Sequence, residues 1–248
     1  MALMSSRLEA LVIDAGEPAR LATFWGQLLG RDVVDTHDEG VLTLPSPDPV
    51  GFAIDIQPTR HAKTLPNRMH FDLTSASFDD QEATVARALE LGARHLDIGQ
   101  GADAEHVVLE DPEGNEFCVI EPGNKFLAGC GTIGALSCDG THAVGLFWQA
   151  ALDWLLVWDE DEETAIQSPH GGTKISWGGP PLMEKPPKNR WHFDLRPNGD
   201  QQAEVERLER LGATRTDIGQ GTVDWVVMRD PDENEFCVLS SPDSANRR

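Results

Sequence analysis

Hydrophobic and polar positions along this chain switch between the two-residue period of a strand and the 3.6-residue period of a helix. A short apolar run at residues 9–14 predicts a strand, and residues 17–30 carry apolar side chains at helical spacing. Pro18 near the start of that segment and Gly30 at its end are typical helix boundaries. Three strand-like segments follow, at residues 32–37, 41–44 and 51–57. The pattern therefore predicts a βαβββ unit.

The same unit recurs along the chain. A second copy begins with the strand at residues 68–74, continues with a helix over about residues 79–91 and ends with three strands near residue 120. The second half repeats both units, with helices expected near residues 141–153 and 200–211. "NRMHFDL" is matched by "NRWHFDL", and "DPEGNEFCVI" by "DPDENEFCVL". We interpret this as an internal duplication, with domains at residues 1–125 and 126–248.

Strand alternation predicts which side chains share a face. In "MHFDL", Met69, Phe71 and Leu73 form an apolar set that a helix would cover, which leaves His70 and Asp72 on the opposite face. The same rule places further polar side chains on that face in both halves: Asp55, Gln57, Glu116, Cys118, His192, Asp194, Glu235 and Cys237. A buried imidazole or carboxylate is costly unless it is paired, coordinated or used, so these residues are candidates for a site. The alternative is that each histidine and its neighbouring aspartate only hydrogen-bond to one another and have no further role.

Composition narrows the classes of function. The formal net charge of −22 argues against nucleic acid as a partner, because nonspecific affinity for phosphates comes from lysine and arginine. The longest apolar stretch is interrupted by Gln149 and Asp153, which argues against a membrane span. The four cysteines lack C-x-x-C spacing, and no signal peptide is apparent. We therefore expect a reduced, cytoplasmic protein. The chain contains no tyrosine.

Four βαβββ units with HFDL and DPxxNEFCV signatures resemble the vicinal oxygen chelate superfamily, and specifically its glyoxalase-like and bleomycin-resistance-like branch. The resemblance implies an α+β fold of two tandem domains, each a pair of units that forms a curved mixed sheet with a cleft. It leaves open whether a cleft forms within one half or between halves. It also leaves open whether the protein is a monomer with an internal pseudo-dimer or a homodimer.

Metal-dependent members of this superfamily place ligands on the first and fourth strands of the units that border a cleft. His70 and His192 match the first-strand histidine, but Cys118 and Cys237 stand where the glutamate ligand is expected. The nearest carboxylate in the first unit is Asp55, and the third unit has Ser176 at that place. We therefore expect no catalytic metal and no cofactor. A divalent metal held by an atypical set such as His70, Cys118 and Asp55 is the alternative.

Two classes of function remain after this comparison. One is a binding protein that sequesters a small organic molecule, such as an aromatic metabolite, with Trp177 and Trp225 at the cleft or its rim. The other is an enzyme of the lyase or isomerase type, in which His70 with Asp72, or His192 with Asp194, does acid–base work. The sequence does not decide between binding and catalysis.

Overall fold

The computed structural model describes residues 5–36, 40–101 and 103–241. Its first half contains β1 (Ser6–Ala15), α1 (Pro18–Leu29), β2 (Val34–Asp35), β3 (Leu42–Leu44), β4 (Ala53–Pro58), β5 (Met69–Leu73), α2 (Phe78–Glu90), β6 (Arg94–His95), β7 (Val107–Glu110) and β8 (Glu116–Val119). Its second half contains β9 (Ile133–Cys138), α3 (His142–Leu152), β10 (Leu155–Glu160), β11 (Glu163–Gln167), β12 (Lys174–Trp177), β13 (Trp191–Pro197), α4 (Gln201–Leu211), β14 (Thr214–Arg215), β15 (Val226–Arg229) and β16 (Glu235–Val238). The four predicted βαβββ units are therefore confirmed. His37, at the end of one predicted strand, lies outside the described residues.

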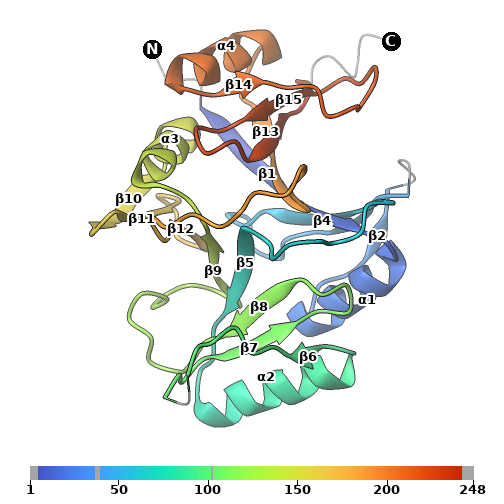
Figure 1. The fold of residues 1–248 in the computed structure, drawn as a ribbon, viewed down its shortest axis with the longest axis vertical. Coiled ribbons are helices and arrows are strands. Elements are labelled where there is room, and N and C mark those ends of the chain that lie inside the picture. Colours follow the sequence, from blue (N-terminus) through green and yellow to red (C-terminus); the bar gives the residue numbers. More distant parts are fainter. Residues whose placement is uncertain (1–4, 37–39, 102, 242–248) are drawn as a thin grey trace.

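The strands form two eight-stranded mixed sheets, which confirms the predicted α+β fold (Figure 1). Sheet A has the order β14-β15-β16-β13-β1-β4-β3-β2, and sheet B has the order β10-β11-β12-β9-β5-β8-β7-β6. The first unit therefore shares a sheet with the fourth, and the second unit shares a sheet with the third. Each sheet combines one unit from each half of the sequence, so the units pair between the halves.

The two sheets are built on equivalent central pairs. β1 and β13 run antiparallel in sheet A, with Val12 opposite His192. β9 and β5 run antiparallel in sheet B, with Ser137 opposite His70. Val12 and Ser137 therefore occupy equivalent positions, each opposite the HFDL histidine of the other half. This register decides which side chains can meet on each sheet.

Alternation along the central strands separates a packed face from a polar one. In β5, Met69, Phe71 and Leu73 are buried, as the sequence predicts. Trp25 of α1 packs against Phe71, with ring centroids 5.1 Å apart, and Phe71 lies 4.8 Å from Trp191 of the other half. These contacts join the two sheets through one continuous hydrophobic core.

The repeated DPxxNE motif has a structural role. The carboxylate of Asp111 accepts hydrogen bonds from the indole N–H of Trp25 at 3.1 Å, from the backbone N–H groups of Glu113 and Asn115 at 2.8 and 3.0 Å, and from the Asn115 amide at 2.8 Å. The carboxylate of Asp230 accepts a hydrogen bond from the indole N–H of Trp148 in the same way, at 3.1 Å. The aspartate thus closes its own turn and holds the helix of the preceding unit.

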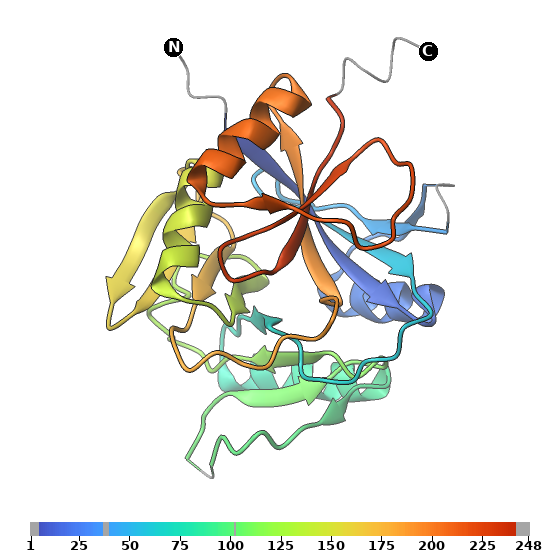
Figure 2. The same cartoon turned by 45° about the horizontal axis from the view of Figure 1, so that its top comes forward.

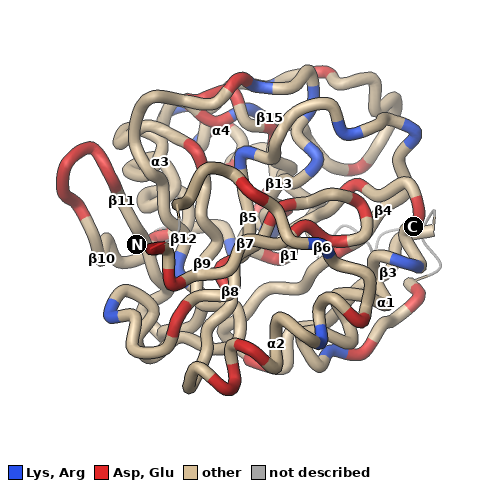
Figure 3. Tube along the Cα trace, turned by 60° about the horizontal axis from the view of Figure 1, so that its bottom comes forward, with Lys and Arg blue, Asp and Glu red and all other residues tan. Residues whose placement is uncertain are grey.

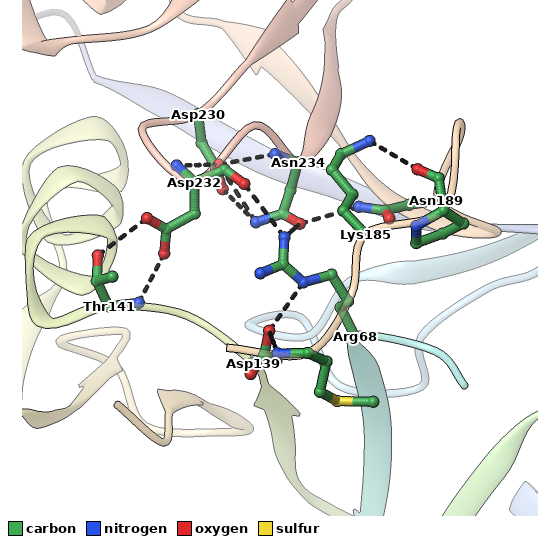
Figure 4. A network of polar contacts seen from close by, with 10 residues as sticks. Arg68, Asp139, Thr141, Lys185, Asn189, Asp230, Asp232 and Asn234 are labelled. Carbon is green, nitrogen blue, oxygen red and sulfur yellow. Dashed lines mark hydrogen bonds and ion pairs between the residues drawn. The ribbon is translucent and has the colours of Figure 1, made fainter. Parts of the chain in front are cut away.

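A second polar network ties three units together at the centre of the molecule (Figure 4). The Arg68 guanidinium donates to Asp139 at 2.8 Å, to the backbone carbonyl of Asp232 at 3.2 Å and to Asn234 at 3.1 Å. Asp232 in turn accepts from the backbone N–H of Thr141 at 2.6 Å, where α3 begins. The network fixes the start of β5 against the third and fourth units.

Acidic residues are spread over the surface, and the tip of the β10–β11 hairpin, residues 159–163, consists entirely of Asp and Glu (Figure 3). This distribution fits the strongly negative net charge. Within the described residues, the structure contains no helix with the length and apolarity that crossing a membrane requires.

Candidate functional site

We call the surface formed by His70, Asp72, Cys118, Ser137 and Ser176 the polar face of sheet B. Adjacent strands β12, β9, β5 and β8 carry these residues in one row. The Ser137 hydroxyl donates to one carboxylate oxygen of Asp72 at 2.5 Å, and His70 Nε2 lies 3.4 Å from the other oxygen. The hydroxyl oxygen of Ser176 lies 3.3 Å from that of Ser137. The result is a connected row of polar groups across four strands.

His70 carries the positive charge of this face. Burial alone would lower the pKa of His70, but hydrogen bonds to Asp72 and Cys118, together with the charge of Asp72, outweigh it and raise the pKa to about 10. The side chain is still 35% exposed. At neutral pH, the polar face of sheet B therefore presents an imidazolium that a ligand can reach.

The equivalent surface on the other sheet, the polar face of sheet A, is formed by Val12, Asp55, His192, Asp194 and Cys237. His192 Nε2 lies 3.6 Å from Asp194, and the His192 side chain is only 8% exposed. His192 Nδ1 and one carboxylate oxygen of Asp194 have no hydrogen-bond partner among the described residues. Val12 stands where sheet B has Ser137, so it offers Asp194 no hydroxyl.

The histidine of this second face has the opposite protonation state at neutral pH. Burial, and then the nearby positive charge of Lys188, lower the pKa of His192 to about 4. Burial, and then the negative charge of Asp55, raise the pKa of Asp194 to about 7. Burial and the charge of Asp194 also raise the pKa of the Cys237 thiol. His192 is therefore neutral at the pH at which His70 is charged.

Each face holds three potential metal donors. In the sets His70, Asp72, Cys118 and His192, Asp194, Cys237, one ligand atom of each residue lies within 4.8 Å of the others. An imidazole, a carboxylate and a thiolate suit a borderline ion such as zinc. The set on sheet A fits such an ion better, because one oxygen of Asp194 has no hydrogen-bond partner among the described residues and is free to coordinate. On sheet B, Asp72 already accepts the Ser137 hydroxyl.

Several predicted ligand-binding residues are held by neighbouring groups of the protein. Glu116 accepts from Lys63 at 2.6 Å and from the backbone N–H of Asn67 at 3.2 Å. Glu235 accepts from Lys185 at 2.7 Å and from the backbone N–H of Asn189 at 3.2 Å. Gln57 donates to Asp14 at 2.6 Å. These contacts fix the linkers that precede β5 and β13, so a ligand would compete with them.

Two placements differ from the sequence analysis. The grouping of Asp55 with His70 and Cys118 is wrong, because β4 belongs to sheet A and brings Asp55 near Asp194. Trp177 lies on the packed face of β12 and is only 2% exposed, whereas Trp225 is 38% exposed beside β15.

The sequence analysis also missed Ser137 and Val12. Their importance depends on which half supplies the neighbouring strand, and no local motif in the sequence reports that pairing.

Comparisons with known proteins agree with this architecture. The profile of the glyoxalase-like domain family matches residues 10–120 and again residues 134–239. Glyoxalase I from Zea mays superposes with a TM-score of 0.64 at 12% identity, covering 95% of this chain and 92% of that one. A putative dioxygenase from Bacillus subtilis superposes with a TM-score of 0.59 at 15% identity, covering 97% and 86%. Among functionally curated proteins, no sequence matches this chain significantly.

Proposed function

Because the chain belongs to the family of glyoxalase-like domains in both of its halves, we propose that it binds a small organic molecule on the polar face of sheet B. The single observation that carries this proposal is the state of His70, which is partly exposed and held beside Asp72. Its counterpart His192 is enclosed. A few fixed polar groups that orient the ligand are a common feature of small-molecule sites.

The charge of His70 favours binding over proton shuttling. An imidazolium that keeps its proton up to about pH 10 is a strong hydrogen-bond donor toward a carbonyl, phenolate or carboxylate oxygen. General acid–base catalysis works best with a pKa near the operating pH. Asp72, fixed by the Ser137 hydroxyl, would hold the ring in place. We therefore propose that the protein sequesters an oxygen-bearing organic molecule, and we favour this function over lyase or isomerase chemistry.

Binding can be tested with a thermal-shift panel of small aromatic acids, phenols and 2-oxo acids on wild-type protein, His70→Gln and His192→Gln. We expect compounds that stabilise the wild type and His192→Gln but lose their effect on His70→Gln. If instead a compound that stabilises the wild type is turned over, and His70→Gln abolishes its turnover while keeping its affinity, the protein is an enzyme. Compounds that depend on His192 and ignore His70 would contradict the proposal.

A second candidate function, a divalent-metal site, is favoured by one observation on sheet A. The buried Nδ1 of His192 and one oxygen of Asp194 lack partners among the described residues, and Cys237 completes a compact donor set. Asp55 lies near enough to influence the charge of Asp194. A metal bound there would supply Lewis-acid polarisation of a substrate oxygen. His192, Asp194 and Cys237 would be its ligands.

The metal candidate has a spectroscopic test that does not need a substrate. Protein purified without chelator would be analysed for zinc, iron, manganese and nickel, and chelator-treated protein would be titrated with Co²⁺. We expect a thiolate-to-cobalt absorption band that Cys237→Ser abolishes and Cys118→Ser keeps. Absence of both stoichiometric metal and this band in the wild type would remove the candidate.

A further inference from the structure

The polar face of sheet B continues outward from His70 to the edge of the sheet. Directly opposite residues in neighbouring strands share a face, and one unbroken line of such partners crosses β5, β9, β12, β11 and β10. Its members, in order, are His70, Ser137, Ser176, Ala165 and Trp158. We call this line the cross-strand row of sheet B. It ends on the outermost strand, whose hairpin with β11 lies at the left margin of the molecule, in yellow (Figure 2).

The outer end of this row is aromatic and accessible. Trp158 is 42% exposed, and its ring centroid lies 6.5 Å from that of Phe126. Lys174 is on the same face, because it precedes Ser176 by two residues in β12. Its ammonium group lies 4.7 Å from the centre of the Phe126 ring and contacts no carboxylate among the described residues. Phe126, Lys174 and Trp158, which we call the aromatic end of the row, therefore combine flat rings with a positive charge.

The part of the row between His70 and the aromatic end carries only serine and alanine side chains. Neighbouring strands are about 4.8 Å apart, so β12, which carries Lys174, lies about 10 Å from β5, and β10 lies about 19 Å from it along the sheet. A single benzene ring beside His70 is about as wide as one strand spacing and does not reach the aromatic end. A molecule that contacts both must separate its oxygen anchor from its flat part by about 10 Å or more.

The equivalent row of sheet A differs at every position after the histidine. Its members, in order, are His192, Val12, Asp55, Thr43 and Val34. Where sheet B has Ser176, this row has Asp55, whose carboxylate accepts from the Thr43 hydroxyl at 2.6 Å. Where sheet B has Trp158, it has Val34. The row of sheet A thus offers a carboxyl group and no ring, so an aromatic end that suits an anion is particular to sheet B.

We propose that the ligand of the polar face of sheet B is an elongated organic anion with a flat aromatic group at its far end. Its oxygen anchor binds His70, as in the function proposed above, on which this assignment rests. Its aromatic group lies against Trp158 and Phe126, and Trp158 selects for length. Lys174 attracts an anion to this face, although the chain as a whole has a formal net charge of −22.

Isothermal titration calorimetry with benzoate and 8-phenyloctanoate tests this selection, because the two probes differ only in the separation between acid and ring. We expect the wild type to bind 8-phenyloctanoate at least about tenfold more tightly than benzoate. Trp158→Ala should weaken binding of the long probe about tenfold and leave benzoate unchanged. The same substitution should weaken binding of 8-cyclohexyloctanoate less, since that probe lacks a flat ring. Phe78→Ala, which removes an aromatic side chain that is 57% exposed at the start of α2, is the matched control and should change neither affinity.

Substitution of His70 separates the shape of the ligand from the binding function itself. His70→Gln should weaken binding of both probes. If binding of the long probe depends on His70 but is equally tight in the wild type and Trp158→Ala, the proposed ligand shape is wrong and the binding function stands. If binding of both probes is indifferent to His70, the binding function is contradicted, and the ligand shape with it. Absence of 8-phenyloctanoate binding to the wild type at about 1 mM would also overturn the proposed shape.

Discussion

The polar faces of sheets A and B carry the same histidine, aspartate and cysteine, yet they differ in charge and accessibility. On sheet B, Ser137 donates to Asp72, and His70 is cationic and partly exposed. On sheet A, Val12 takes the place of Ser137, and His192 is neutral and enclosed. The difference comes from residues outside the repeated motif.

Burial is the largest cause of the shifted pKa values on sheet A, and nearby charges add to it. Burial, and then the charge of Asp55, raise the pKa of Asp194 to about 7, and Val12 offers this carboxylate no hydroxyl donor. Lys188, which stands where the first half has Pro66, lowers the pKa of His192 by its charge. A duplicated motif can therefore keep its scaffold while its two histidines acquire opposite protonation states.

The scaffold shared by both halves gives the largest expected effect. Asp111→Ala and Asp230→Ala each leave a buried indole N–H and several turn N–H groups without an acceptor. Each substitution should lower the free energy of unfolding by about 3 kcal/mol, since a buried unpaired group costs about 1–3 kcal/mol. Urea unfolding would measure both, with exposed Asp79→Ala as the control. A loss in only one of the two variants would show that the halves are not structurally equivalent.

The pH dependence of stability should separate the two histidines. The pKa of His70 is raised to about 10, so its contribution is present below pH 6.5 and is lost as pH rises from 6.5 to 10. The pKa of His192 is lowered to about 4, so its contribution is present above pH 6.5 and is lost as pH falls toward 4. In chelator-treated protein, His70→Gln should flatten the alkaline range of the urea-midpoint profile, and His192→Gln the acidic range. If both substitutions flattened the same pH range of the profile, the two histidines would not differ as this comparison requires.

A smaller effect tests the role of Val12. Val12→Thr keeps the side-chain shape and adds a hydroxyl at the position equivalent to Ser137. The pKa of Asp194 should then fall from about 7 toward the ordinary range, because the ionised carboxylate gains a donor. Carboxyl ¹³C NMR would follow the titration. Val12→Ala, which removes bulk without adding a donor, should leave the pKa of Asp194 raised; an equal fall in both variants would contradict the assignment.

The sequence predicted the elements and their faces well, because both follow from local periodicity. The helix stop at Gly30 and the alternation of Met69, Phe71 and Leu73 depend on neighbours within a few residues, and the structure confirms them. The repeat also identified His70 and His192 as equivalent.

What the sequence could not predict was the partner of each unit. Asp55 was grouped with His70, but strand pairing between halves places it on sheet A. Ser137 acts on Asp72 from 65 positions away in the sequence, and Lys188 acts on His192 from 4 positions away. Neither Ser137 nor Lys188 lies in a repeated motif. Burial of His192 and exposure of His70 likewise depend on packing between distant segments. The identical motifs therefore do not predict that His70 and His192 differ in charge.

The protonation of the two rings is the most direct test of the account. Histidine ¹⁵N NMR on chelator-treated protein, assigned with His70→Gln and His192→Gln, reports how many ring nitrogens carry a proton. The account predicts that His70 is still an imidazolium at pH 8 and that His192 is still neutral at pH 5.5. Titration of both rings together between about pH 6 and 7, as for unperturbed histidines, would contradict it.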